Sequence, residues 1–185
     1  AARHLGMNVA HDEVIRTIQG DYVFVSRRYD RQFIDGSWRR LHQEDLCQAM
    51  SVMPERKYQS DGGPSVKQIA LLLSRSADLG SRERTLRSFY EALVFNVAMQ
   101  GTDAHAKNYS LMLNGDEVKL APLYDLGSHA AYPPANGSRL DLAMSIDGEY
   151  RIDSVGADQL AKAARPLGID QDEAREIARS YFTNT

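Results

Sequence analysis

The chain has 185 residues, of which 43% are hydrophobic and 25% are charged, and its net charge is −3. This composition is ordinary for a globular protein and gives no overall basic surface for nucleic acid or membrane binding. No apolar run approaches the roughly 20 residues needed to span a membrane, and a single cysteine excludes an internal disulfide. We therefore expect a cytoplasmic protein of one domain, with or without a small extension.

The start of the chain favours β-strands. The stretches "EVIRTI" (13–18) and "YVFVSRRY" (22–29) are rich in β-branched and aromatic residues, and residues 19–21 between them predict a hairpin turn. Asp35-Gly36 predicts a second turn. A short strand is expected after it, at 38–41.

From residue 43 the pattern becomes helical. The stretch "QEDLCQAMSV" (43–52) has helical apolar spacing and stops before Pro54. The stretch "VKQIALLLS" (66–74) presents one apolar face. The strongest helix is predicted at 82–99, where apolar residues recur at intervals of three and four until Gly101. We expect this helix to form the centre of the core.

A hairpin follows the long helix. Two apolar runs, 109–113 and 117–121, flank Asn114-Gly115, which is a strong signal for a tight turn between two strands. Residues 127–138 are rich in Gly, Pro and Ser and predict a loop. Two more helices are expected at 157–166 and 171–181. The prediction is an α+β fold, in which a small β-rich start (1–42) precedes a mostly helical body (43–185) that carries this hairpin.

The loop between the long helix and the hairpin holds four chemically active side chains, namely Asp103, His105, Lys107 and Asn108. A loop that is held at both ends is a common way to position catalytic groups. Protein kinases place an Asn five positions after the Asp that accepts the proton of the substrate hydroxyl. The Asn oxygen is a hard ligand that helps to hold Mg²⁺.

The remaining positions also fit this kinase pattern. Asp125 follows the second strand, where kinases carry a second, metal-binding Asp. Lys107 would be a cation near the transferred phosphoryl group. His105 would orient the loop through a hydrogen bond to the backbone.

Two other interpretations fit the same residues. In the first, Asp103 caps a turn, Lys107 is solvated, and Asn108 makes a turn hydrogen bond. In the second, Asp103, His105 and Asp125 bind a transition metal in a hydrolase, because imidazole suits Zn or Fe better than Mg.

Several ordered blocks resemble the HipA-type toxin kinases of bacterial toxin–antitoxin modules. "GTDAHAKNYSLML" and "VKLAPLYDLGS" look like the catalytic segments of that family, while "RRYDR" (27–31), "LHQEDLCQAM" and "KYQSDGGPS" resemble its "ERFDR", "RLPQEDLCQ" and "KYxxDGGPG" blocks. The resemblance covers residues 1–165. It implies the C-terminal lobe of a protein-kinase-like fold and Ser/Thr phosphorylation with ATP and Mg²⁺. By position, Asp103 would be the catalytic base, and Asn108 and Asp125 would hold the metal.

The same resemblance implies a hinge in which the backbone of Arg27, Arg28 and Tyr29 faces the adenine of ATP. Arg27 stands where the family often has Glu, so only backbone contacts are carried over at that position. The Gly-rich stretch 60–65 would either shape the substrate side of the cleft or serve as a simple connector.

The family's kinases begin with further elements, namely a phosphate-covering loop, a strand Lys and a regulatory Ser, and none of these is found before Ala1. We therefore expect residues 1–42 to be the remnant of an N-terminal lobe with its hinge, and residues 43–185 to be the C-terminal lobe. The expectation follows that this chain alone binds ATP poorly and transfers no phosphate.

The resemblance also implies partners. These are a protein substrate, for which the family suggests an aminoacyl-tRNA synthetase, and a DNA-binding antitoxin, through which any contact with nucleic acid would be indirect. A third interpretation follows from it, namely a non-catalytic module that docks such an antitoxin.

Overall fold

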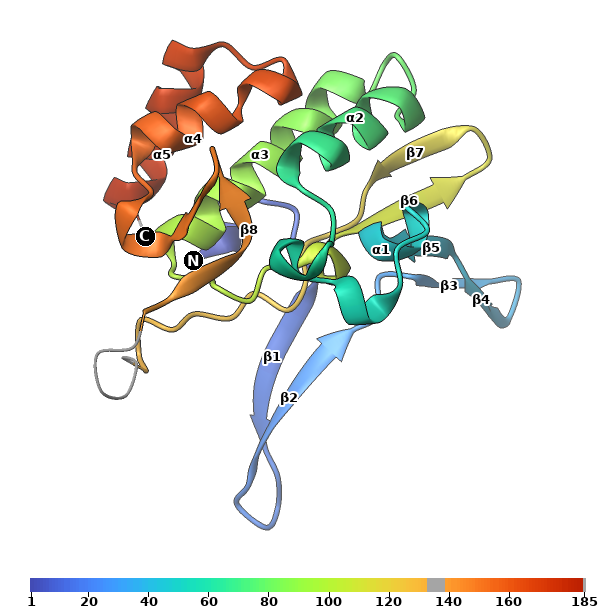
Figure 1. The fold of residues 1–185 in the computed structure, drawn as a ribbon. Helices are drawn as coiled ribbons and strands as arrows, with labels where there is room; N and C mark the ends of the chain where they lie inside the picture. Colours follow the sequence, from blue (N-terminus) through green and yellow to red (C-terminus); the bar gives the residue numbers. More distant parts are fainter. Residues whose placement is uncertain (133–138, 185) are drawn as a thin grey trace.

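The computed structural model describes residues 1–132 and 139–184, and it mixes α-helices with small antiparallel sheets (Figure 1). The predicted loop at 127–138 lies partly outside these residues. The strands are β1 (His11–Arg16), β2 (Tyr22–Arg27), β3 (Arg31–Ile34), β4 (Ser37–Arg40), β5 (His42–Asp45), β6 (Ser110–Asn114), β7 (Glu117–Leu120), β8 (Asp141–Ile146) and β9 (Glu149–Arg151). The α-helices are α1 (Leu46–Ala49), α2 (Val66–Ser76), α3 (Arg82–Ala98), α4 (Ala157–Ala163) and α5 (Gln171–Asn184).

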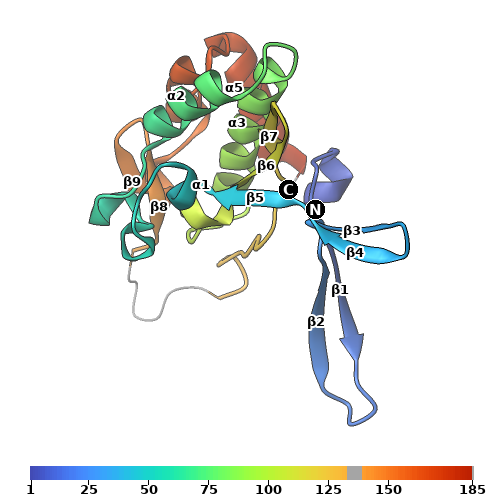
Figure 2. The same ribbon diagram turned by 90° about the vertical axis from the view of Figure 1, so that its right-hand side faces the viewer.

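The first four strands form two separate hairpins, β1–β2 and β3–β4. Both extend away from the helices, and β1–β2 reaches farthest (Figure 1, Figure 2). The two predicted turns therefore occur as expected. The side chains of β1–β2 are mostly exposed, including Val14 at 64% and Phe24 at 66%.

The sheet β5-β6-β7 joins the start of the chain to the predicted hairpin. His42–Asp45 pairs antiparallel with β6, which also pairs with β7. The predicted helix at 43–52 was therefore wrong in its first turn, because residues 43–45 obtain their backbone hydrogen bonds from β6. The helix α1 begins only at Leu46, where the Asp45 carboxylate accepts a hydrogen bond from the Gln48 amide in a capping box.

The core is built around α3, which lies between α2, α5 and the strands (Figure 1). Its predicted bounds are confirmed to within one residue. Tyr90 in α3 is buried and donates a hydrogen bond from its hydroxyl to the Ala174 carbonyl of α5, 2.8 Å away. Fully buried side chains from four helices meet here: Ile69, Leu73, Phe89, Tyr90, Val94, Leu160, Ala174 and Ala178. Within the described residues, none of the helices has the length and apolar character needed to cross a bilayer.

The hairpin β8–β9 was not predicted from the sequence. It contacts α2 and α4 through β8, whose Ala143 amide also donates to the Thr102 carbonyl at 2.9 Å. The predicted helix at 157–166 is shorter, since α4 ends at Ala163 and Arg165–Leu167 form a 3₁₀ turn that contains Pro166. Through Ala143, β8 therefore contacts the loop that follows α3.

Candidate active site

The predicted loop at 101–108 follows the end of α3, and its first residue, Gly101, lies very close to Asn96 and Gly127. Its amide donates to the Asn96 carbonyl at 2.7 Å. A Cβ on Gly101 would lie 2.8 Å from Asn96 Oδ1 and 3.0 Å from the Gly127 carbonyl oxygen. Only glycine therefore lets the loop pass between α3 and the segment that follows Asp125.

Asn108 and Asp125 lie together in the structure. Asn108 Nδ2 donates to Asp125 Oδ2 at 2.7 Å. Asn108 is buried, and its Oδ1 atom makes no hydrogen bond to the described residues. Asp125 has a φ of 54°, an uncommon left-handed backbone conformation that is frequent at functional sites. The free Asn108 Oδ1 atom and the Asp125 carboxylate together offer two oxygen ligands that suit a hard cation.

Asp103 shares a pocket with Asp125. The pocket has a volume of about 160 Å³ and is also lined by Asn96 and Gly127. The Asp103 carboxylate accepts a hydrogen bond from the Tyr58 hydroxyl, with an Oη–Oδ1 distance of 2.7 Å. This bond raises the pKa of Tyr58 to about 12, because the neutral phenol is the donor and a phenolate would face the carboxylate.

His105 is buried against Tyr58. The two ring centroids are 5.2 Å apart in an edge-on arrangement, and the His105 amide donates to the Asp103 carbonyl at 2.8 Å. Burial lowers the pKa of the imidazole, and the nearby Lys57 charge adds to this effect. His105 is therefore held inside the loop as a neutral ring, and its Nδ1 atom makes no hydrogen bond to the described residues.

Lys107 points to a partner that was not predicted. Its Nζ atom lies 2.8 Å from Oδ2 of Asp45, the N-cap residue of α1. The Lys107 side chain is 36% exposed and that of Asp45 is 14% exposed. In this arrangement the Lys107 charge joins the loop to α1, and its role near a phosphoryl group stays a prediction.

We expect Lys107→Met to lower the free energy of unfolding at pH 7 by up to about 1 kcal/mol, since the pair is screened by solvent. The Asp45 bond raises the pKa of Lys107 above 10.5 in the folded state. This contribution is therefore complete below pH 10.5 and is lost as the pH rises through the folded-state value. Urea unfolding at neutral and strongly alkaline pH measures it. Lys119→Met, which removes an exposed pair with Glu117, is the control and should change little.

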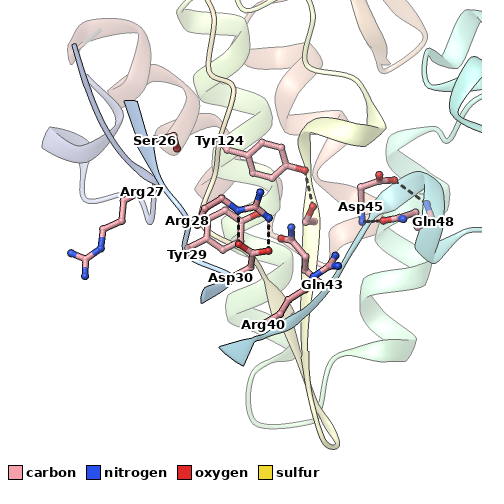
Figure 3. A pocket seen from close by; sticks show the side chains of 11 residues that line it. Ser26, Arg27, Arg28, Tyr29, Asp30, Arg40, Gln43, Asp45, Gln48 and Tyr124 are labelled. Carbon is pink, nitrogen blue, oxygen red and sulfur yellow. Dashed lines mark hydrogen bonds and ion pairs between the residues drawn. The ribbon is translucent and has the colours of Figure 1, made fainter. Parts of the chain in front are cut away.

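A second pocket lies at the predicted hinge and has a volume of about 310 Å³ (Figure 3). Arg27, Arg28 and Tyr29 all contribute to its lining, but the Arg27 side chain points away from the other labelled side chains. The Arg28 guanidinium donates two hydrogen bonds to buried Asp30, at 2.7 and 2.6 Å, and holds the pKa of that carboxyl below its ordinary value. The hinge is therefore anchored through Asp30.

Tyr124 connects the two pockets. It lines the hinge pocket, while the next residue, Asp125, lines the smaller one. The Tyr124 hydroxyl lies 2.6 Å from both the Lys107 carbonyl oxygen and Ser110 Oγ. It therefore links the 101–108 loop to the strand that follows it.

The alternative transition-metal site is not supported by this geometry. In the part of the chain that the structure describes, no group of three or more His, Cys, Asp or Glu side chains is arranged to hold a metal ion. Asp103, His105 and Asp125 therefore do not form the ligand cluster that a hydrolase of that kind requires.

Sequence reasoning missed Tyr58 and Asp45 as members of this site. Both lie in sequence blocks that resemble the HipA-type kinases, "KYQSDGGPS" and "LHQEDLCQAM". The signal that could have pointed to them is a polar side chain inside a family-like block, even though that block is far from the loop along the chain. Their contacts with Asp103 and Lys107 span 45 and 62 positions.

A model of the HipA-like C-terminal domain family matches the chain over residues 1–185. The chain belongs to this family. It is 32% identical over 182 residues to the serine/threonine-protein kinase toxin HipA of Shewanella oneidensis. It is 38% identical over 170 residues to Y4mE of Sinorhizobium fredii, which is a kinase by name. The alignment with HipA covers 92% of the present chain and 41% of HipA. The alignment with Y4mE covers 91% of the present chain and 39% of Y4mE. The present chain therefore spans about two fifths of the length of these relatives.

A solved structure agrees with this membership. One chain of the complex of HipA, HipB and operator DNA from the Shewanella oneidensis MR-1 toxin–antitoxin system matches with a TM-score of 0.80 and 28% identity. The match covers 98% of the present chain and 43% of the matched chain in the solved complex. The resemblance stated from the sequence blocks is thereby confirmed, and the HipA-like chain is related to kinases.

Proposed function

We propose that this HipA-like domain carries the catalytic loop of a serine/threonine protein kinase that transfers the γ-phosphate of ATP to a protein hydroxyl. The observation that carries the proposal is the shared pocket of Asp103 and Asp125, with Asn108 bonded to Asp125. Further support comes from relatives that are named as kinases.

Asn108 and Asp125 would hold Mg²⁺. The fit rests on the unpartnered Oδ1 atom of buried Asn108 beside the Asp125 carboxylate, since Mg²⁺ prefers oxygen ligands. A bound Mg²⁺ would neutralise negative charge on the nucleotide phosphates. Asn108 Nδ2 orients the Asp125 carboxylate before any ligand arrives.

Asp103 would accept the proton of the acceptor hydroxyl as that oxygen attacks the γ-phosphorus. A new O–P bond forms, the bond from phosphorus to the β–γ bridging oxygen breaks, and ADP leaves with the electron pair. Asp103 suits this role because its carboxylate lines the same pocket as Asp125. His105, a buried ring whose lowered pKa keeps it neutral, packs edge-on against Tyr58 and carries no charge in the step.

We propose that the adenine of ATP lies in the hinge pocket, against the backbone of Arg27, Arg28 and Tyr29. Tyr124 and Asp125 are consecutive and line the two pockets, which supports a nucleotide with its base in the larger pocket and its phosphates in the smaller one. Residues 1–42 would then belong to an N-terminal lobe with the hinge, and residues 43–185 to the C-terminal lobe.

We further propose a DNA-binding antitoxin as a partner and a protein as the phosphate acceptor. The support is the solved toxin–antitoxin complex, in which a chain similar to this one occurs with HipB and operator DNA. Any contact of this protein with DNA would then pass through the antitoxin.

Replacement of Asp103 by Asn in the full-length protein tests the proposal. We expect phosphate transfer from labelled ATP to fall by about 10²- to 10⁴-fold, which is the usual contribution of a general base. Asp116→Asn, in the turn between β6 and β7, is a matched control that should keep full activity. Equal transfer by Asp103→Asn and wild type would overturn the proposed role, and a wild-type protein that transfers no phosphate would favour a non-catalytic module.

A further inference from the structure

We propose that Tyr58 is a positioning residue that fixes the carboxylate of Asp103 for proton acceptance. This inference rests on the proposed kinase function. Tyr58 lies in the connector between α1 and α2, outside the loop that carries Asp103, His105 and Asn108. Its hydroxyl donates to Oδ1 of Asp103 at 2.7 Å.

The hydrogen bond leaves one carboxylate oxygen available. Oδ2 of Asp103 makes no hydrogen bond to the described residues, so it is open to an acceptor hydroxyl. A carboxylate on a loop rotates about its last bond unless one oxygen is held. Tyr58 is suited to hold it because its phenol stays protonated and donates well above neutral pH. The second oxygen is then presented in a constant direction.

The ring of Tyr58 is itself held from two sides. His105 meets it edge-on at 5.2 Å between centroids, and the Lys57 ammonium lies 4.9 Å from the ring centroid. The Ala106 amide donates to the Lys57 carbonyl at 3.3 Å, which joins the connector to the 101–108 loop. The donor and the carboxylate are therefore parts of one packed unit.

The residue that follows Tyr58, Gln59, is hydrogen-bonded to β8. Gln59 Nε2 donates to Ser145 Oγ at 2.9 Å, and the Ser145 amide donates to Gln59 Oε1 at 3.0 Å. The Gly63 amide donates to the Tyr58 carbonyl at 2.9 Å and closes the turn. Gln59 and the Gly63 turn therefore fix the backbone on which Tyr58 reaches Asp103.

The first test measures steady-state kinetics of the full-length protein with Tyr58→Phe, which removes one oxygen and keeps the ring. We expect kcat to fall by about 10- to 100-fold, which corresponds to one hydrogen bond to a charged group. The KM for ATP should stay within about twofold, because Tyr58 contacts the loop and lies outside the hinge pocket. Tyr150→Phe, in β9, is the control and should change neither constant. An unchanged kcat in Tyr58→Phe would overturn the proposal.

The second test needs no activity. With carbon-13 in the tyrosine rings, NMR follows the protonation of Tyr58, which is assigned by its loss in Tyr58→Phe. We expect Tyr58 to titrate near pH 12 in the wild type and at a clearly lower pH in Asp103→Asn, because the hydrogen bond to the Asp103 carboxylate is the largest cause of the raised pKa. Identical titration in both proteins would refute the contact.

The two tests separate the two proposals. If the wild type transfers no phosphate, the kinase proposal fails, while the titration still decides whether Tyr58 holds Asp103. If the wild type is active and the titration shows the contact, only the kcat of Tyr58→Phe decides the positioning role.

Discussion

Replacement of Asp125 by Asn is expected to lower phosphate transfer by the full-length protein by at least about 10³-fold. Asp125 supplies the carboxylate next to the unpartnered Asn108 oxygen, and the amide of Asn would leave the cation without its charged ligand. We expect Mg²⁺-dependent binding of ATP to be lost together with transfer. Calorimetric titration with Mg²⁺ and nucleotide measures the first, and transfer from labelled ATP measures the second.

The chain offers a close control for this variant. Asp147 has a φ of 53°, nearly the same as the 54° of Asp125, and it lies in the turn between β8 and β9. Asn tolerates this left-handed conformation as well as Asp does. Asp147→Asn should therefore keep both binding and transfer. Retention of more than a tenth of wild-type transfer by Asp125→Asn would argue against a metal ligand at this position.

Replacement of Gly63 by Ala should lower the free energy of unfolding by about 2–3 kcal/mol, the upper part of the range for overpacked sites. A Cβ there would lie 2.3 Å from the Arg56 carbonyl oxygen and 2.6 Å from the Tyr58 carbonyl oxygen. Both obstacles are backbone atoms, so the turn must open and carry Tyr58 away from Asp103. We therefore expect transfer by the full-length protein to fall as well.

Urea unfolding of the chain measures the stability effect. Gly127→Ala is the control for stability, because a Cβ at that position would meet no atom within 4 Å. It should change the free energy of unfolding by less than about 0.5 kcal/mol. Equal stability of Gly63→Ala and wild type would show that the turn adapts without cost.

Elements with a strong local pattern were predicted well. The periodic apolar residues of 82–99 became α3, and the Asn-Gly turn became the β6–β7 hairpin. In contrast, the sequence pattern predicts the first turn of a helix at residues 43–45, where the structure has β5. Its partner, β6, is more than 60 positions away, so the pairing leaves no local trace.

The candidate site also has a part that the sequence predicts and a part that only the fold reveals. The spacing of Asp103, Asn108 and Asp125 was read from the sequence, and the fold brings Asn108 to Asp125 and places both aspartates around one pocket. Their chemical roles stay predictions. The contacts of Tyr58 with Asp103 and of Asp45 with Lys107 were not anticipated, because each joins elements that only packing brings together.

The sequence by itself therefore determined the family, the long core helix and the loop with its candidate groups, since these depend on motifs and periodicity within a short stretch. Only the tertiary structure decided which groups hold the loop in place. Tyr58 reaches Asp103 because the Gly63 turn and β8 fix the connector beside the loop. Such contacts depend on the packing of distant elements, which no local pattern of residues encodes.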